Sequence, residues 1–275
     1  MTERAKPPIA LTIAGSDSGG GAGIQADLKT FQAFGVFGTS AITAITAQNT
    51  FGVSDVHPVP VEVVRAQIRA VASDLHPAAF KTGMLATVEI IEGVADAIEA
   101  EALKRYVLDP VMVATSGSRL LAPAAERAIV DHLLPLCEIV TPNLPEALVL
   151  LGESRTLTAE RVNASEEDLR GYASALVERG ARAALVKGGH LMGDEVVDVL
   201  YDGDRCRVWR RPRIDTTSTH GTGCTLSAAI AAGLARGQPL HEAVERGLDF
   251  VARALATAPG LGAGHGPLNH FIERS

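Results

Sequence analysis

The chain has 275 residues, of which 47% are hydrophobic and 21% are charged, and its formal net charge at pH 7 is -7. This composition excludes a disordered chain, and the acidic balance argues against a general nucleic-acid binder, which depends on lysine and arginine to neutralise phosphates. Three widely spaced cysteines, Cys137, Cys206 and Cys224, suit neither a disulfide framework nor a paired-cysteine metal site. The first 15 residues are not typical of a signal peptide, and no stretch is long enough to span a bilayer. We therefore expect a cytoplasmic protein without membrane or nucleic-acid partners.

Apolar, β-branched runs alternate with amphipathic helical windows. The expected strands cover 8–15, 39–46, 78–83, 106–110, 138–143 and 183–189. The expected helices lie between them, at 24–35, 61–75, 88–100, 124–135 and 144–152. This alternation predicts an α/β fold with a mostly parallel central sheet and helices on both faces.

The C-terminal part of the chain departs from this alternation. Residues 195–209 predict a β-hairpin that turns at Asp202 and Gly203, and a long helix is expected after Gly223, ending at Gly237. The most polar stretch, at about 151–168, is expected to be a surface segment between helices. Because no repeat or composition shift marks a boundary, we expect one domain, 1–275.

Small and polar residues follow the expected strands, at the edge where open parallel sheets bind ligands. They are Gly15–Asp17, Lys81–Gly83, Asp109 with Pro110, Thr141–Asn143 and Lys187–Gly189. This placement predicts a small-molecule enzyme or binding protein.

The glycine cluster at 15–23 lies between an expected strand and an expected helix. Residues 21–26 fit the loose dinucleotide pattern GxGxxA, which keeps an NAD(P) oxidoreductase as an alternative, although no acidic residue clearly closes a second strand. A Walker loop is excluded, since no Gly-Lys-Ser/Thr follows. The cluster is otherwise either a flexible turn or a backbone that approaches a ligand closely.

Asp109, Glu146 and Lys187 follow expected strands and together indicate phosphate chemistry. Mg²⁺ commonly takes one or two carboxylates together with phosphate oxygens, and the glycines after Lys187 would let a phosphate reach both backbone and ammonium. Glu146 could instead simply stabilise the first turn of its helix. His190 and His220 lack the spacing of a metal motif, so we expect them to be polar lining.

Cys224 comes directly after Gly221, Thr222 and Gly223, at the start of the expected long helix. A free cysteine in such a place is often a small packed hydrophobe. The N–H groups of a helix N-terminus also form an anion site, and the same field is expected to lower the pKa of the thiol.

Seven motifs resemble, in the same order, those of the hydroxymethylpyrimidine/hydroxymethylpyrimidine phosphate kinases, the thiamine-synthesis members of the ribokinase-like family. They are GSDSGGGAGIQADLKTF, ITAQNT, KTGML, LDPVM, TPNLPEA, VKGGH and STHGTGCT. The resemblance extends from about Ile9 to about Ile272. It implies a ribokinase-like fold with a small flap rather than a lid domain, and a homodimer.

The resemblance implies ATP- and Mg²⁺-dependent phosphorylation of 4-amino-5-hydroxymethyl-2-methylpyrimidine, and then of its monophosphate to the pyrophosphate. The amides of Gly221, Thr222 and Gly223 would stabilise the phosphoryl oxygens, and Cys224 would take the hydroxyl proton, where the wider family has aspartate. The implied pyrimidine-binding residues are Gln48, Gly15, Asp27, Met84 and Val111. The implied metal residues are Asp109 and Glu146, and the implied ATP contacts are Lys187 and Asn143.

Three alternatives stay open beside this interpretation. A pyridoxal/pyridoxine kinase would act on a pyridine with a similar hydroxymethyl arm. A catalytically silent nucleotide- or pyrimidine-binding regulator would not need the full set of charged residues. A dehydrogenase would bind NAD(P).

Overall fold

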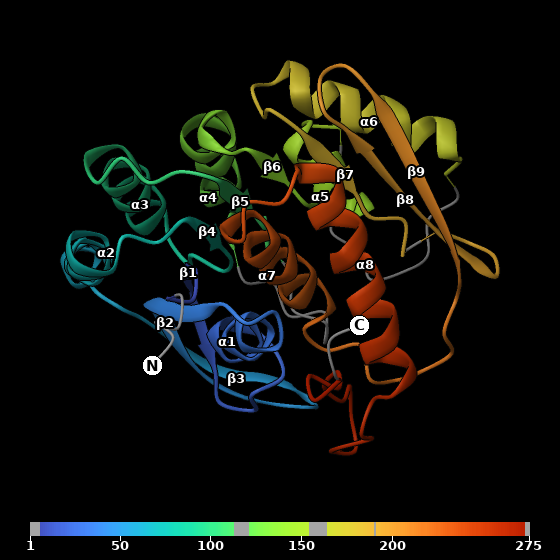
Figure 1. Ribbon diagram of the computed structural model, residues 1–275, viewed down its shortest axis with the longest axis horizontal. Coiled ribbons are helices and arrows are strands. Elements are labelled where there is room, and N and C mark those ends of the chain that lie inside the picture. The colour runs from blue at the N-terminus through green and yellow to red at the C-terminus, as the bar shows by residue number, and fades with distance from the viewer. Residues whose placement is uncertain (1–5, 113–120, 154–163, 190, 273–275) are drawn as a thin grey trace, which may run out of the picture.

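The computed structural model describes residues 6–112, 121–153, 164–189 and 191–272. In this part of the chain, nine strands form one sheet in the order β3-β2-β1-β4-β5-β6-β7-β8-β9 (Figure 1). The strands are β1 (Ile9–Asp17), β2 (Phe37–Asn49), β3 (Gly52–Pro58), β4 (Ala79–Thr82), β5 (Tyr106–Leu108), β6 (Ile139–Val140), β7 (Ala184–Val186), β8 (Glu195–Tyr201) and β9 (Cys206–Pro212). All strand pairs from β2 across to β7 are parallel, and antiparallel strands occur only at the two edges. The expected mostly parallel sheet is therefore confirmed.

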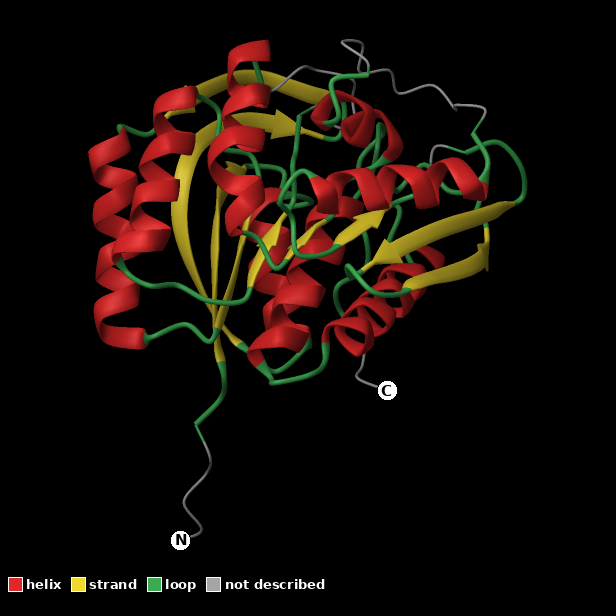
Figure 2. Ribbon diagram, turned by 90° about the horizontal axis from the view of Figure 1, so that it is seen from above, coloured by secondary structure: helices red, strands yellow, loops and turns green. Residues whose placement is uncertain are grey.

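Helices cover both faces of the sheet, as Figure 2 shows. One face packs against α1 (Gly23–Ala33), α7 (Thr222–Ala235) and α8 (Leu240–Ala256). The other packs against α2 (Val61–Leu75), α3 (Val88–Ala100), α4 (Pro123–Ala128), α5 (Leu144–Leu150) and α6 (Glu166–Glu178).

The alternation of side chains along each strand divides the apolar residues between two cores. Leu11 and Ile13 belong to the core beneath α2 and α3, whereas Ala10 belongs to the core beneath α1 and α7. In β4, Phe80 joins the first core, so the next side chain, Lys81, lies on the α1 and α7 face. Period-two packing thus directs a lysine toward the helices that carry the site.

The expected elements are present, with differences at their ends. β1 continues to Asp17 instead of ending at Gly15, and α7 begins at Thr222 rather than after Gly223. The expected helix at 124–135 ends as an α-helix at Ala128 and continues through a π-helical turn and a short 3₁₀ turn. Pro135 lies in that last turn, where its ring and missing N–H oppose a regular helix.

Two elements, β3 and α8, were not expected from the sequence, and α6 begins earlier than the helix expected after the polar stretch. β3 lacks a clear alternating pattern because its residues are largely exposed at the sheet edge. α6 begins inside the polar stretch, where Ser165 and Asp168 form a capping box. Residues 154–163 of that stretch lie outside the described residues.

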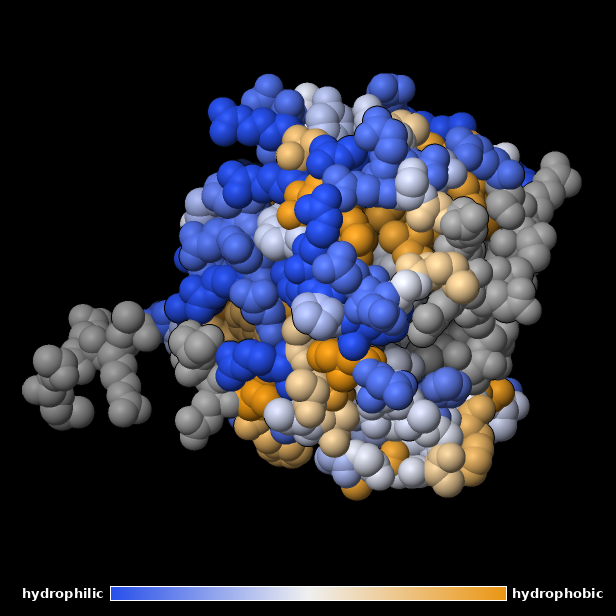
Figure 3. Space-filling model, turned by 90° about the vertical axis from the view of Figure 1, so that its right-hand side faces the viewer, coloured by the Kyte–Doolittle hydropathy of each residue, from blue (hydrophilic) through white to orange (hydrophobic). Residues whose placement is uncertain are grey.

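Hydrophilic residues predominate on the side of the molecule shown in Figure 3, and apolar residues occupy separate areas between them. Among the helices of the described segments, none combines the length and the apolar character needed to cross a membrane.

Candidate active site

The N-terminus of α7 is held against the glycine-rich loop after β1. Gly221 has φ 84° and ψ 9°, a left-handed conformation that favours glycine. A Cβ atom at this position would lie 1.9 Å from the carbonyl oxygen of Gly21. Glycine at 221 therefore permits both the turn and the close approach, and the first-turn N–H groups of α7 provide an anion site.

A carboxylate and an ammonium group lie beside this helix N-terminus. Lys187 Nζ is 3.8 Å from Asp109 Oδ1, and a Cβ atom at Gly223 would lie 3.2 Å from Lys187 Nζ. The hydroxyl of Ser227, one turn further along α7, donates to Asp109 Oδ2 at 3.0 Å. The structure thus brings Gly223, Asp109 and Lys187 together from three separate elements, as the sequence predicted.

Asn143 and Glu146 lie next to this group, at the N-terminus of α5. Asn143 Oδ1 accepts from the Glu146 N–H at 2.9 Å, while Glu146 Oε2 accepts from the Asn143 N–H at 2.8 Å. The backbone of Asn143 also forms a bridge with Lys187. The side chain of Asn143 is therefore engaged in capping the helix, and the cap holds Glu146 in place.

The pKa of Glu146 reflects its buried position near Asp109 and Lys187. The pKa of Glu146 is raised to about 7, mainly by burial; Lys187 lowers it and Asp109 raises it. Two buried carboxylates that repel each other fit a hydrated Mg²⁺, which needs only one or two carboxylates when phosphate oxygens complete its shell. No cluster of three or more His, Cys, Asp or Glu able to hold a metal occurs among the described residues.

Cys224 lies near the same charges but is not the activated thiol that its helix position predicts. Burial raises its pKa to about 12; Lys81 lowers the pKa, while Asp109 and Asp27 raise it. The expectation of a lowered pKa is therefore wrong, because desolvation and two carboxylates outweigh the helix N-terminus and the nearby ammonium. The thiol is neutral at physiological pH.

Lys81 is a functional candidate to which the sequence assigned no role. Its Nζ lies 3.2 Å from Asp27 Oδ1 and 3.6 Å from Asp109 Oδ2, and all three side chains are almost completely buried. Although burial lowers the pKa of Lys81, Asp27, Cys224 and Asp109 raise it above its usual value. Lysine at the end of a buried strand is the signal that could have identified this charge.

Asp27 was expected near the pyrimidine, and the structure places it in the interior. Its side chain is 0% exposed, and Thr12 Oγ1 donates to Oδ2 at 2.6 Å. Burial raises the pKa of Asp27 to about 6, against the opposing effects of Lys81 and Thr12. With both oxygens engaged, this carboxylate supports Lys81 from below rather than presenting a free surface.

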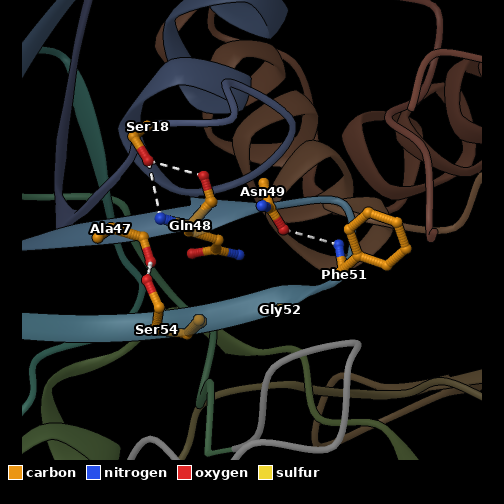
Figure 4. A pocket seen from close by; sticks show the side chains of 8 residues that line it. Ser18, Ala47, Gln48, Asn49, Phe51, Gly52 and Ser54 are labelled. Atoms are coloured by element: carbon orange, nitrogen blue, oxygen red, sulfur yellow. Dashed lines mark hydrogen bonds between the residues drawn. The ribbon is translucent and has the colours of Figure 1, made fainter. Parts of the chain in front are cut away.

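The other four residues expected around the pyrimidine lie in three places. A Cβ atom at Gly15 would lie 2.5 Å from Met84 Cε, so these two residues are in contact. Val111 donates its N–H to Asp109 O at 2.9 Å. Gln48 is half-buried and lines an open hollow of about 510 Å³ beside β2 and β3 (Figure 4). Among the described residues, no hydrogen bond joins Gln48 to the other three.

The two histidines that were expected to be polar lining have different outcomes. His220 is 7% exposed and hydrogen-bonded, as buried polar residues normally are. His190 lies outside the described residues.

Comparison with known proteins gives a consistent result. The family model for phosphomethylpyrimidine kinase matches residues 17–269. A hydroxymethylpyrimidine/phosphomethylpyrimidine kinase of Rhizobium meliloti is 52% identical over 265 residues, which are 96% of this chain and 97% of that protein. The thiamine biosynthesis bifunctional protein ThiED of Geobacter sulfurreducens is 46% identical; the match covers 95% of this chain and 52% of that protein.

Solved structures add a related activity. The structure of the pyridoxal kinase from Staphylococcus aureus in complex with AMP-PCP and pyridoxal has a TM-score of 0.87 to this chain. The two sequences are 37% identical, and the match covers 98% of this chain and 97% of that one. The expected ribokinase-like, α/β architecture is confirmed by this likeness.

Proposed function

The chain belongs to the phosphomethylpyrimidine kinase family, and we propose that it phosphorylates 4-amino-5-hydroxymethyl-2-methylpyrimidine and then its monophosphate, with ATP as donor, for thiamine synthesis. The observation that carries the proposal is the cluster at the N-terminus of α7, where Lys187 and Asp109 lie beside Gly223. A helix N-terminus with an adjacent ammonium suits the charge of a transferring phosphoryl group.

The backbone of Gly221, Thr222 and Gly223 is proposed to hold the phosphoryl oxygens. Gly221 is the N-cap residue of α7, and the Thr222 N–H donates to Thr219 O at 3.3 Å, so this backbone is already held in place before charge develops. Donors that need no rearrangement are the basis of electrostatic stabilisation in a partly desolvated site. Lys187 adds a positive charge to the same place. Gly221 fixes the loop by its contact with Gly21.

Asp109 and Glu146 are the residues that would hold Mg²⁺, and Lys187 and Asn143 are proposed to lie along the ATP phosphates. When bound, Mg²⁺ neutralises phosphate charge and orients the donor. Burial is the main cause of the raised pKa of Glu146, and the Asp109 carboxylate adds to it against the opposing effect of Lys187. A cation at this place would offset both causes, which supports the role.

Cys224 is proposed to face the substrate hydroxyl as a neutral thiol. In a loose phosphoryl-transfer transition state the hydroxyl proton leaves late, so a base that is already ionised is not required. A thiolate would also repel the incoming phosphate. The sulfur would accept the hydroxyl proton while its own proton passes to an oxygen of the transferring phosphoryl group. One proton then stays on sulfur throughout, which is consistent with the raised pKa.

The heterocycle is proposed to lie against Gln48, with Gly15, Met84 and Val111 nearby. A primary amide offers both an N–H donor and an oxygen acceptor, the complement of an aminopyrimidine edge. Asp27 does not contact the heterocycle in this proposal; its carboxylate pairs with the ammonium of Lys81 and holds it in place.

A mass-resolved kinase assay with ATP and Mg²⁺ tests the proposal, with the hydroxymethylpyrimidine in one tube and pyridoxal in another. Mono- and then diphosphorylated pyrimidine is the expected result. Product from pyridoxal alone would assign a pyridoxal kinase activity to this chain instead, as in the Staphylococcus aureus pyridoxal kinase. The absence of product from both heterocycles would refute the proposed kinase activity.

The role of Cys224 has its own test. Cys224→Ala is expected to bind ATP as the wild type does and to lose at least about 10²-fold in turnover, the lower range for a positioned proton acceptor. Near-normal turnover would reject the assignment.

We also propose a single domain and a cytoplasmic homodimer. The exposed apolar side chains of Ile45 (54% exposed) and Phe51 (71% exposed) on the β2–β3 edge support a second copy there. Light scattering on the purified protein measures the mass directly.

A further inference from the structure

His220 and Asp17 join the glycine-rich loop to the residue that is proposed to read the pyrimidine. His220 Nε2 lies 2.8 Å from Asp17 Oδ2 and 3.2 Å from Gln48 Nε2. Asp17 also accepts N–H groups from Gly19, Gly21 and Ala22, so its carboxylate organises the whole loop. His220 is therefore tied to a rigid acceptor on one side and touches Gln48 on the other.

The proton on His220 follows from this arrangement. Although burial raises the pKa of Asp17, the hydrogen bonds from His220, Ala22 and Gly19 lower it below its usual value. An ionised carboxylate only accepts, so Nε2 of His220 carries the hydrogen and has no lone pair in the ring plane. The short nitrogen-to-nitrogen contact with Gln48 cannot then be a hydrogen bond, because both atoms are donors.

Thr46 constrains the other end of the same amide. Its Oγ1 lies 2.8 Å from Ser16 O and 3.1 Å from Gln48 Oε1. A hydroxyl has one hydrogen, and the carbonyl of Ser16 can only accept, so that hydrogen is directed to Ser16. Thr46 is left with lone pairs toward Gln48, where an N–H would make a hydrogen bond and an oxygen does not.

Both neighbours therefore favour the amide of Gln48 turned by 180°. In that orientation its nitrogen donates to Thr46, which offers lone pairs. Its oxygen replaces an NH₂ group beside the Nε2–H of His220 and is the second acceptor of that hydrogen, which Asp17 shares. The backbone of Gln48 cannot follow a rotation, because Ser18 bonds to both its N–H and its carbonyl (Figure 4). Each end of the amide keeps one further position for a ligand, a lone pair on oxygen and an N–H on nitrogen.

We propose that the Asp17–His220 pair, opposed by Thr46 and Ser16, fixes the Gln48 amide with its oxygen toward His220 and so selects a heterocycle with an exocyclic amine beside a ring-nitrogen acceptor. The inference rests on the proposed function, because it takes Gln48 as the residue that contacts the substrate. A heterocycle of the same shape with oxygen in place of the amine presents the opposite pattern. It can pair only if the amide turns and loses both neighbours. His220 is thus a positioning residue that determines specificity, not a catalytic one.

The test compares kcat/KM for the 4-amino pyrimidine and for its 4-oxo analogue. In His220→Phe the ring remains but the donor is lost, and in Thr46→Val the acceptor is lost at nearly constant shape. Each variant is expected to lower the amino-to-oxo ratio about tenfold, the value of one buried hydrogen bond. Because general damage to the α7 loop slows both substrates alike, the ratio separates positioning from a structural role.

Two further variants serve as rescue and control. His220→Gln keeps an N–H that can donate, and it is expected to retain most of the discrimination. Thr39→Val removes a buried hydroxyl at the other end of β2 that bonds to Ala10 O, and the ratio should stay at the wild-type value. An unchanged ratio in both His220→Phe and Thr46→Val overturns the inference, even where the wild type phosphorylates the pyrimidine.

Failure of the proposed kinase activity can be distinguished from failure of the positioning role of His220. A wild type that transfers no phosphate to the 4-amino pyrimidine refutes the proposed activity. Calorimetric binding of the two heterocycles without nucleotide then gives the ratio of their affinities, amino to oxo, in the four variants. Equal discrimination by His220→Phe, Thr46→Val and the wild type in that experiment also overturns the inference.

Discussion

Replacing Lys81 by methionine removes the positive charge at the centre of the buried ion cluster. Its ammonium lies 3.2 Å from Asp27 and 3.6 Å from Asp109, with all three side chains 0–2% exposed. At an effective dielectric constant of about 20, each pair contributes roughly 5 kcal/mol of Coulomb energy. The variant is also relieved of the several kcal/mol that it costs to bury an ammonium. We therefore expect Lys81→Met to lower the free energy of unfolding by about 3–5 kcal/mol.

Urea unfolding at pH 7 measures this change, and a second substitution tests its cause. In Lys81→Met/Asp27→Asn the most deeply buried carboxylate no longer needs a partner, so about half of the loss or more should be recovered. Arg65→Met is the matched control, because Arg65 and Asp96 form an ion pair at a similar 3.3 Å but with side chains 35% and 63% exposed. That pair should contribute less than about 1 kcal/mol. A loss below about 1 kcal/mol in Lys81→Met, or a double variant no more stable than the single one, would refute the reasoning.

Three further predictions concern the site. Gly221→Ala should destabilise the protein by at least about 2 kcal/mol in urea unfolding and lower turnover, because alanine opposes a φ of 84° and its Cβ meets Gly21 O; wild-type stability would contradict this. The pKa of Glu146 rises from 4.5 to about 7 on folding. The contribution of Glu146 to folding stability is therefore fully present below pH 4.5 and is lost as the pH rises through 7. Glu146→Gln in metal-free buffer should flatten the fall in stability over that window, and an unchanged slope would count against the raised pKa. Iodoacetamide at pH 8 should modify Cys224 much more slowly than the exposed Cys206, as peptide mapping would show, whereas equal rates would indicate an accessible thiolate.

Much of the fold was predictable because local patterns dominate in its central part. The helices at 61–75 and 88–100 have the bounds that their apolar spacing predicts, since each buries one continuous stripe. The mostly parallel sheet follows from the alternation of strands and helices. β3 was missed because its residues are largely exposed at the sheet edge, so no strong periodicity marks it. α6 does bury apolar residues at helical spacing, Leu169, Ala173 and Leu176, but it begins inside the polar stretch that was assigned to the surface segment.

The sequence by itself determined which chemistry is present and where it falls along the chain. Carboxyl ends of parallel strands share one edge, so Asp109, Asn143 and Lys187 had to lie near each other. Only the tertiary structure decided the states of these groups. The thiol pKa depends on how burial and two carboxylates compare with one ammonium, and the partners of Gln48 come from residues 2, 30 and 172 positions away. Desolvation and hydrogen-bond direction depend on distances in space, and such distances between remote segments have no counterpart in local sequence patterns.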